Sequence, residues 1–98
     1  MSDYYDKAGN AIAIEAWTKL YRDAEYKRIA SDKAGDTFVS TVWLGLNHAW
    51  EGPPLIFETM VFEGPLDGEC DRYSTLAQAE AGHAAMLARV LAARGSES

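Results

Sequence analysis

Residues 36–63 read DTFVSTVWLGLNHAWEGPPLIFETMVFE, and this stretch decides the fold. Two runs within it, Thr37 to Leu44 and Leu55 to Phe62, are rich in β-branched and aromatic residues, which favour strands. The ten residues between them include Gly, Asn and Pro, which are typical of a loop. We therefore predict that the two runs form the central antiparallel pair of a small sheet.

The alternation of polar and apolar residues along the central strands is incomplete. Neither face of Thr37 to Leu44 is purely polar, so both faces of the sheet are expected to be at least partly covered. In the second strand Glu58 stands between Ile56 and Met60 in an otherwise apolar row. Because an unpaired carboxylate is costly to bury, Glu58 is expected either to reach solvent or to meet Arg72, a lysine or a histidine.

The segment before residue 36 predicts a helix and one more strand. Between Ala13 and about Asp23 the apolar residues recur at spacings of three and four, which is typical of an amphipathic helix. These residues are Ile14, Trp17, Leu20 and Tyr21. Asn10 can cap this helix, although it lies two residues early. Ala24 to Arg28 can add a further helical turn, and Ile29 to Asp32 a strand that a hairpin turn connects to Thr37.

After the second central strand the sequence predicts a turn, a short edge strand and a long helix. Glu63 to Gly68 has turn residues, and Glu69 to Tyr73 has the charges that often protect an edge strand. Thr75 and Gln78 have the pattern of a capping box, from which a helix rich in Ala, Leu, Glu and Gln continues to Arg94. Its expected buried stripe contains Leu76, Ala79, His83, Leu87 and Val90, with Met86 and Leu91 at its margins.

We predict a single α+β domain over residues 1–98, with residues 1–3 and 95–98 frayed. The sheet is expected to be small, mainly antiparallel and four- or five-stranded, in meander order. An N-terminal helix and the long C-terminal helix are expected to pack on one of its faces. Gly82 is expected to let another backbone approach the long helix. The predicted core contains Trp17, Trp43, Phe57, Leu76 and Leu87.

The composition argues against several classes of protein. The chain has 15 acidic and 9 basic side chains, a net charge of -6 and no cluster of Lys and Arg, which argues against a nucleic-acid binder. Cys70 is the only cysteine, so neither an intrachain disulfide nor a thiolate-rich metal site can form. No apolar run approaches the ~20 residues that span a bilayer, and the N-terminus is too polar for a signal peptide. We expect no cofactor, no membrane partner and a cytoplasmic location.

The loop between the two central strands is the expected binding site. A loop of this length on a rigid scaffold is a common place for binding residues. The candidates in it are Asn47, His48, Trp50, Glu51 and Pro53. The alternative is a structural loop in which Trp50 closes over the end of the core and His48 is solvated. A second candidate surface is the acidic turn with Glu63, Asp67 and Glu69, followed by Asp71, although a solvated turn explains these acids equally well.

No residue is predicted to be catalytic or to bind a metal. The sequence lacks a nucleophile in a strained turn, a glycine-rich phosphate loop and a metal spacing such as HxxxH. His83, on the apolar stripe of the long helix, is expected at the edge of the core with one ring nitrogen hydrogen-bonded. Cys70 is expected to be inert.

Several stretches of the chain resemble one family. The sequences VSTVWLGLNHAW, PPLIFETMVF and DRYSTLAQAEAGHAAM, with an N-terminal part similar to GNAI…W…L, resemble small hypothetical proteins of actinobacterial phages and prophages. The resemblance covers nearly the whole chain, but that family has no assigned activity, so it implies no site residue. It departs at Ala13, where the family has a Ser, Thr or Asp that would cap the first helix. It implies a phage accessory protein acting in the cytoplasm of a bacterial host.

Three functions from different classes follow as hypotheses. The first is a non-enzymatic module that contacts a host protein through the loop and the acidic turn. The second is a structural or self-associating protein, such as a homodimer or a minor virion component, that packs through its edge strand and a small-residue helix face. That face contains Ala77, Ala81, Ala84 and Ala88. The third is a small hydrolase or nucleotide-binding counter-defence protein that uses His48, Glu58 and His83, and it requires these three residues to lie together.

Overall fold

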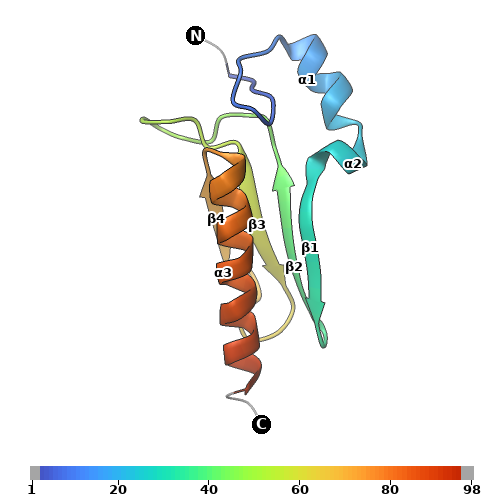
Figure 1. Cartoon of the computed structure of the whole chain (residues 1–98), viewed down its shortest axis with the longest axis vertical. Helices are drawn as coiled ribbons and strands as arrows, with labels where there is room; N and C mark the ends of the chain where they lie inside the picture. Colours follow the sequence, from blue (N-terminus) through green and yellow to red (C-terminus); the bar gives the residue numbers. More distant parts are fainter. Residues whose placement is uncertain (1–2, 96–98) are drawn as a thin grey trace.

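The computed structural model describes residues 3–95 and confirms the α+β class. Four antiparallel strands lie in the order β1-β2-β3-β4, which is the predicted meander (Figure 1). The long C-terminal helix runs along one face of this sheet. The elements are α1 (Ile14–Tyr21), α2 (Ala24–Lys27), β1 (Arg28–Ala34), β2 (Thr37–Trp43), β3 (Phe57–Phe62), β4 (Cys70–Tyr73) and α3 (Leu76–Gly95).

The strand register assigns every strand residue to one of two faces. Thr41 is opposite Thr59, and Trp43 is opposite Phe57, so these four residues share the face that α3 covers. Residues that alternate with them point to the other face, because side chains of a strand alternate with a period of two. Only two residues, starting at Gly35 with a φ of 61°, connect β1 to β2. A positive φ favours glycine there.

Helix α3 covers the first face with a stripe of four buried side chains. They are Ala79, His83, Met86 and Val90. The predicted stripe is thus correct at three positions but is centred wrongly, because Met86 is buried, Leu87 is half-buried and Leu76 is 37% exposed. The predicted capping box is confirmed, since Gln78 N donates to Thr75 Oγ1 at 3.1 Å and Thr75 N donates to Gln78 Oε1 at 3.3 Å.

Gly82 makes room for a side chain, whereas the sequence analysis predicted an approaching backbone. A Cβ atom at this position would overlap the ring of Tyr73 on β4, so a larger residue would require that ring or α3 itself to shift.

The two short helices lie at the end of the sheet where β2 ends (Figure 1). There they close a second part of the core around Trp43, Ile56 and Phe57, against which Trp17 packs half-buried. Asn10 does not cap α1; its side chain bonds Asp6 instead, and Ala13 at the N-cap makes no side-chain cap. Helix α2 is capped by Asp23, whose carboxylate accepts from the next turn.

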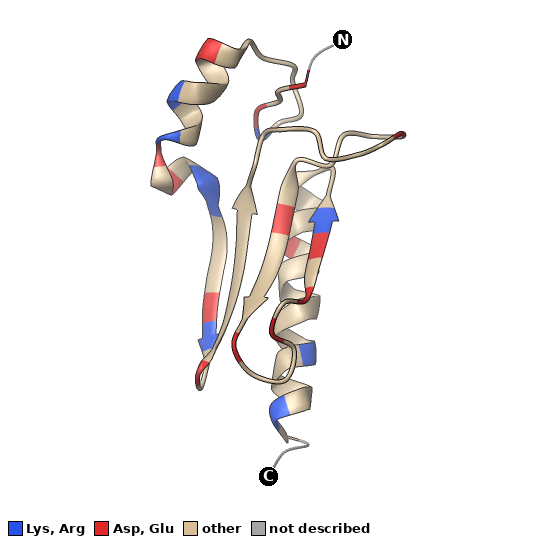
Figure 2. Ribbon diagram, turned by 180° about the vertical axis from the view of Figure 1, so that it is seen from behind, with Lys and Arg blue, Asp and Glu red and all other residues tan. Residues whose placement is uncertain are grey.

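The second face of the sheet is open. In the part of the chain that the structure describes, no helix lies over it (Figure 2). Phe38 is 43% and Phe62 is 49% exposed on this face, and Val42 and Met60 are half-buried. The predicted partial cover of this face is therefore missing around Phe38 and Phe62. An apolar strip along the two central strands, with Phe38, Val42, Met60 and Phe62, is left partly exposed.

The predicted fraying at the ends falls largely outside the described residues. Residues 1, 2 and 96–98 are not described, whereas the carbonyl of Asp3 accepts a hydrogen bond from Asn47 N at 2.9 Å and Gly95 is the last residue of α3. Among residues 3–95, no helix is both long and apolar enough to cross a membrane.

Candidate binding site

A pocket with a volume of about 390 Å³ lies between α1, the base of the 44–56 loop and the open face of the sheet. Its size is at the lower end of the range of ligand pockets, which is about 300–1,000 Å³. Most of its lining is aromatic or aliphatic, and two charged side chains complete it. The lining residues are Trp17, Tyr21, Leu44, Leu46, His48, Glu58 and Arg72.

The two charged residues of the pocket form an ion pair between neighbouring strands. Glu58 is opposite Arg72 in the register of β3 and β4, and Arg72 Nε donates to Glu58 Oε2 at 3.0 Å. The Glu58 side chain is 16% exposed, and that of Arg72 is 42% exposed. Of the two outcomes expected for Glu58, the structure therefore shows pairing with Arg72, which compensates the cost of removing the carboxylate from water.

The aromatic wall of the pocket comes from α1. Trp17 and Tyr21 are one helical turn apart, and their rings stack with centroids 4.7 Å apart. The indole Nε1 of Trp17 donates to the carbonyl of Leu44 at 2.9 Å, which fixes the ring against the end of β2. The ammonium group of Lys27 lies 3.9 Å from the centre of the Tyr21 ring, a cation–π contact at the rim.

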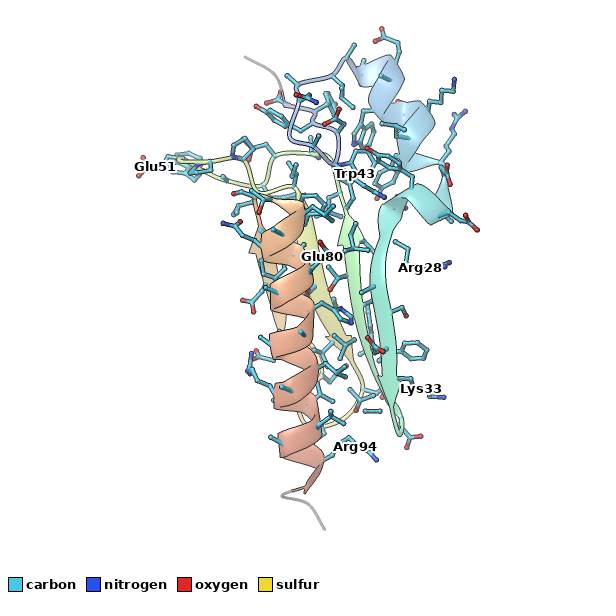
Figure 3. All side chains as sticks on the ribbon, in the orientation of Figure 1. Arg28, Lys33, Trp43, Glu51, Glu80 and Arg94 are labelled. Carbon is cyan, nitrogen blue, oxygen red and sulfur yellow. The ribbon has the colours of Figure 1, made fainter. Side chains whose placement is uncertain are left out.

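The loop that follows the pocket is held firmly at its base. Asn47 Oδ1 accepts hydrogen bonds from Ala49 N at 2.8 Å and from Leu55 N at 3.2 Å, and His48 N donates to the carbonyl of Leu55 at 3.0 Å. The tip then projects away from the domain, with Glu51 at its end (Figure 3). Trp50 is 99% exposed, so it does not close over the core.

The acidic turn lies at the opposite end of the sheet from this loop (Figure 1). Two of its acids have local roles: Asp67 Oδ1 accepts from Glu63 N at 2.6 Å, and Glu69 pairs with Arg89 on α3 at 2.7 Å. The loop residues Asn47, His48, Trp50, Glu51 and Pro53 and the turn residues Glu63, Asp67 and Glu69 thus form two separate surfaces.

The structure brings together two of the three residues that the enzyme hypothesis requires. His48 and Glu58 line the same pocket, but His83 lies on the other side of the sheet, on the face of α3 that packs against the strands. His83 is buried there as a structural link, with Nδ1 2.7 Å from Thr41 Oγ1 and Nε2 2.7 Å from Asp32 Oδ2. The sequence predicted one hydrogen-bonded ring nitrogen in His83, whereas both ring nitrogens have a hydrogen-bond partner.

Cys70 and the remaining acids do not extend the site into a metal centre. Cys70 is exposed on β4, where it is opposite Met60. Across residues 3–95, no three His, Cys, Asp or Glu side chains are grouped so that they could hold a metal ion.

Sequence reasoning missed most of the pocket. It assigned Trp17 to the core and gave Tyr21, Leu44 and Leu46 no role in a site, because their meeting depends on where α1 lies relative to the sheet. Two signals were available: His48 belonged to the predicted binding loop, and Glu58, in an otherwise apolar row, required a partner.

No family model matches this chain, and neither a curated protein nor a solved structure matches it.

Proposed function

We propose that this chain is a non-enzymatic protein-binding module whose binding element is the loop 47–54, with Trp50 as its anchor. The observation that supports this most directly is the 99% exposure of Trp50 at the tip of a projecting loop. Tryptophan is the residue most enriched among those that dominate the energy of protein interfaces. A tryptophan that covers nothing in its own domain has a large apolar surface available for a partner.

The fixed base of the loop supports the same role. Asn47 holds both sides of the loop through Ala49 and Leu55, so the tip is displayed in a defined direction. Ordering a loop on binding costs free energy, and a loop that is already held costs less. Glu51 and Pro53 flank the anchor and can supply a polar contact and a rigid edge to the same interface.

The partner that we propose is a protein of a bacterial host. The resemblance to proteins of actinobacterial phages supports this context, and the protein would then act as a phage accessory factor in the host cytoplasm. The net charge of -6 favours a protein partner over a nucleic acid, because the chain as a whole repels a polyanion at long range.

Substituting Trp50 should abolish partner capture without unfolding the domain. Tagged protein is incubated with lysate of an actinobacterial host, captured proteins are identified by mass spectrometry, and the best candidate is purified for a titration. Trp50→Ala is expected to weaken binding at least tenfold, as loss of a hot-spot residue does. The matched control is Leu91→Ala, which removes another exposed apolar side chain on the distant helix α3 and should change nothing.

Two results would contradict the proposal. Equal binding by wild type and Trp50→Ala would move the interface away from the loop. If the tagged protein captured only further copies of itself, and light scattering showed a dimer, self-association would be favoured. The structural feature that supports self-association is the exposure of Phe38 and Phe62 on the open face.

A further inference from the structure

The charge of the open sheet face is opposite in sign to that of the chain. Its strand residues include three basic side chains, Arg28, Lys33 and Arg72, and one acidic side chain, Glu58, by the register of the four strands. The whole chain has a net charge of -6. Figure 2 shows blue positions at both ends of β1 and at the end of β4, and red positions on β1, β3 and β4. The red positions on β1 and β4 are Asp32 and Asp71, which the strand register assigns to the other face. The side chains of Arg28 and Lys33 project from β1 in Figure 3.

We propose that the pocket on this face binds an acidic segment of the partner protein, in which an aromatic side chain inserts beside Trp17 and Tyr21 and a neighbouring carboxylate bonds Arg72. This inference rests on the proposed function, because it names the chemistry of the partner. It concerns a second contact region, distinct from the tip of the loop.

Arg72 has the hydrogen-bonding capacity that such a carboxylate needs. Only its Nε is used by Glu58, and its two terminal nitrogens make no hydrogen bond to any described residue. A guanidinium can bind a carboxylate through two parallel N–H donors, which adds direction as well as strength. With Arg28 and Lys33 along the far edge, an acidic segment meets attractive charges at both sides of the sheet.

The apolar part of the occupant is matched by the walls of the pocket. The stacked rings of Trp17 and Tyr21 and the aliphatic side chains of Leu44 and Leu46 line it together. Aromatic pairs contribute beyond the area that they bury, so an aromatic side chain fits this wall better than an aliphatic one. From Glu58 in the pocket, the apolar strip with Met60 and Phe62 continues along β3 for roughly 13 Å, a length that four residues of an extended peptide can follow.

A second copy of this chain is a poorer occupant than an acidic peptide. If two copies packed with their open faces together, their basic side chains would lie across the same interface. Like charges placed across an interface lower the affinity. Outside this face the two copies are acidic and also repel each other at long range.

A peptide titration tests the inference with the purified protein alone. The probe is a capped heptapeptide of glycine and serine that contains one phenylalanine followed by two aspartates. One control peptide has asparagine in place of both aspartates, and another has alanine in place of phenylalanine. Because the probes lack tryptophan, the indole N–H resonances of Trp17, Trp43 and Trp50 report the site by NMR. Saturable shifts of Trp17, with Trp50 unchanged and a dissociation constant of about 1 mM or below, are expected.

Three substitutions separate the charge contributions. Arg72→Gln should weaken binding of the acidic peptide about tenfold and leave the asparagine peptide unchanged. Arg89→Gln is the matched control, because it removes the other Arg–Glu ion pair at a distance from the pocket. Glu58→Gln should tighten binding of the acidic peptide several-fold, since it removes the one acid among the described lining residues and releases Arg72. A gain of affinity cannot result from unfolding.

The inference is overturned if no saturable shift appears at several millimolar peptide. Equal affinity for the aspartate and asparagine peptides, or shifts confined to Trp50, would overturn it equally. Each of these results leaves the proposed function intact, because capture through Trp50 does not depend on Arg72. Conversely, if Trp50→Ala captured the partner as well as wild type did, while the peptide still bound the pocket, the proposed function would be refuted and the pocket would remain a separate peptide site.

Discussion

Trp43→Ala is expected to lower the free energy of unfolding by about 3–5 kcal/mol, from lost transfer energy and the cavity that remains. Trp43 is fully buried at the junction of the sheet with α1 and α2, and its ring meets Tyr26 edge-on with centroids 4.9 Å apart. Its indole also donates to the carbonyl of Tyr5 at 3.0 Å, which ties down the N-terminal segment. The total free energy of unfolding of a domain of this size is about 5–15 kcal/mol, so this loss is a large share of it.

The measurement is a thermal melt followed by circular dichroism, compared with Leu87→Ala. For a domain of this length each kcal/mol lowers Tm by about 4–8 °C, so Trp43→Ala should melt roughly 12 to 40 °C below wild type. Leu87, on α3, is only half-buried, and removal of its side chain should lower the free energy of unfolding clearly less. Similar melting temperatures for both variants would show that the core is not centred on Trp43.

The strands and the long helix were predictable because local chemistry specifies them. The runs around Val39 and Val61 are rich in β-branched and aromatic residues, which suit a pleated surface, and the Thr75 capping box marks a helix start without any tertiary information. The exact rotation of α3 was less accessible. Its Ala-rich sequence has little contrast between faces, so the choice of Met86 over Leu87 depends on how the helix sits on the sheet.

The candidate site was predictable in its loop and at Glu58, but not as a pocket. Glycine, proline and asparagine mark residues 45–54 as a loop, whereas the pocket joins Trp17 on α1 with Arg72 on β4, which are distant in sequence. Only the tertiary packing of α1 against the sheet brings these two residues to one pocket. The separation of the loop from the acidic turn is a simpler consequence of the meander, because successive connections between antiparallel strands emerge at opposite ends of the sheet. The two predicted surfaces could have been recognised as separate on that ground.

His83→Ala is expected to destabilise the domain by about 2–4 kcal/mol, because it leaves a cavity and removes a partner from the buried hydroxyl of Thr41. His83 lies between Thr41 under the helix and Asp32 at the sheet edge, with both contacts at 2.7 Å. Asp32→Ala should cost less than about 1 kcal/mol, because its carboxylate is half exposed and contributes as surface ion pairs do. Urea titrations of the two variants measure both values, and a larger loss for Asp32→Ala would contradict this order.

The hydroxyl chain beneath α3 should show a non-additive response to mutation. Thr41 Oγ1 lies 2.5 Å from Thr59 Oγ1 and also contacts His83, while Thr41 and Thr59 are both fully buried. Thr41→Val therefore leaves two buried polar groups without their partner, which costs about 1–3 kcal/mol for each group. Once Thr41 is valine, Thr59→Val removes a hydroxyl that has already lost its partner, and this second step should cost little or stabilise the protein. In a double-mutant cycle, a coupling energy near zero would show that the two hydroxyls act independently. A clear coupling energy would show that Thr41, Thr59 and His83 act as one structural unit.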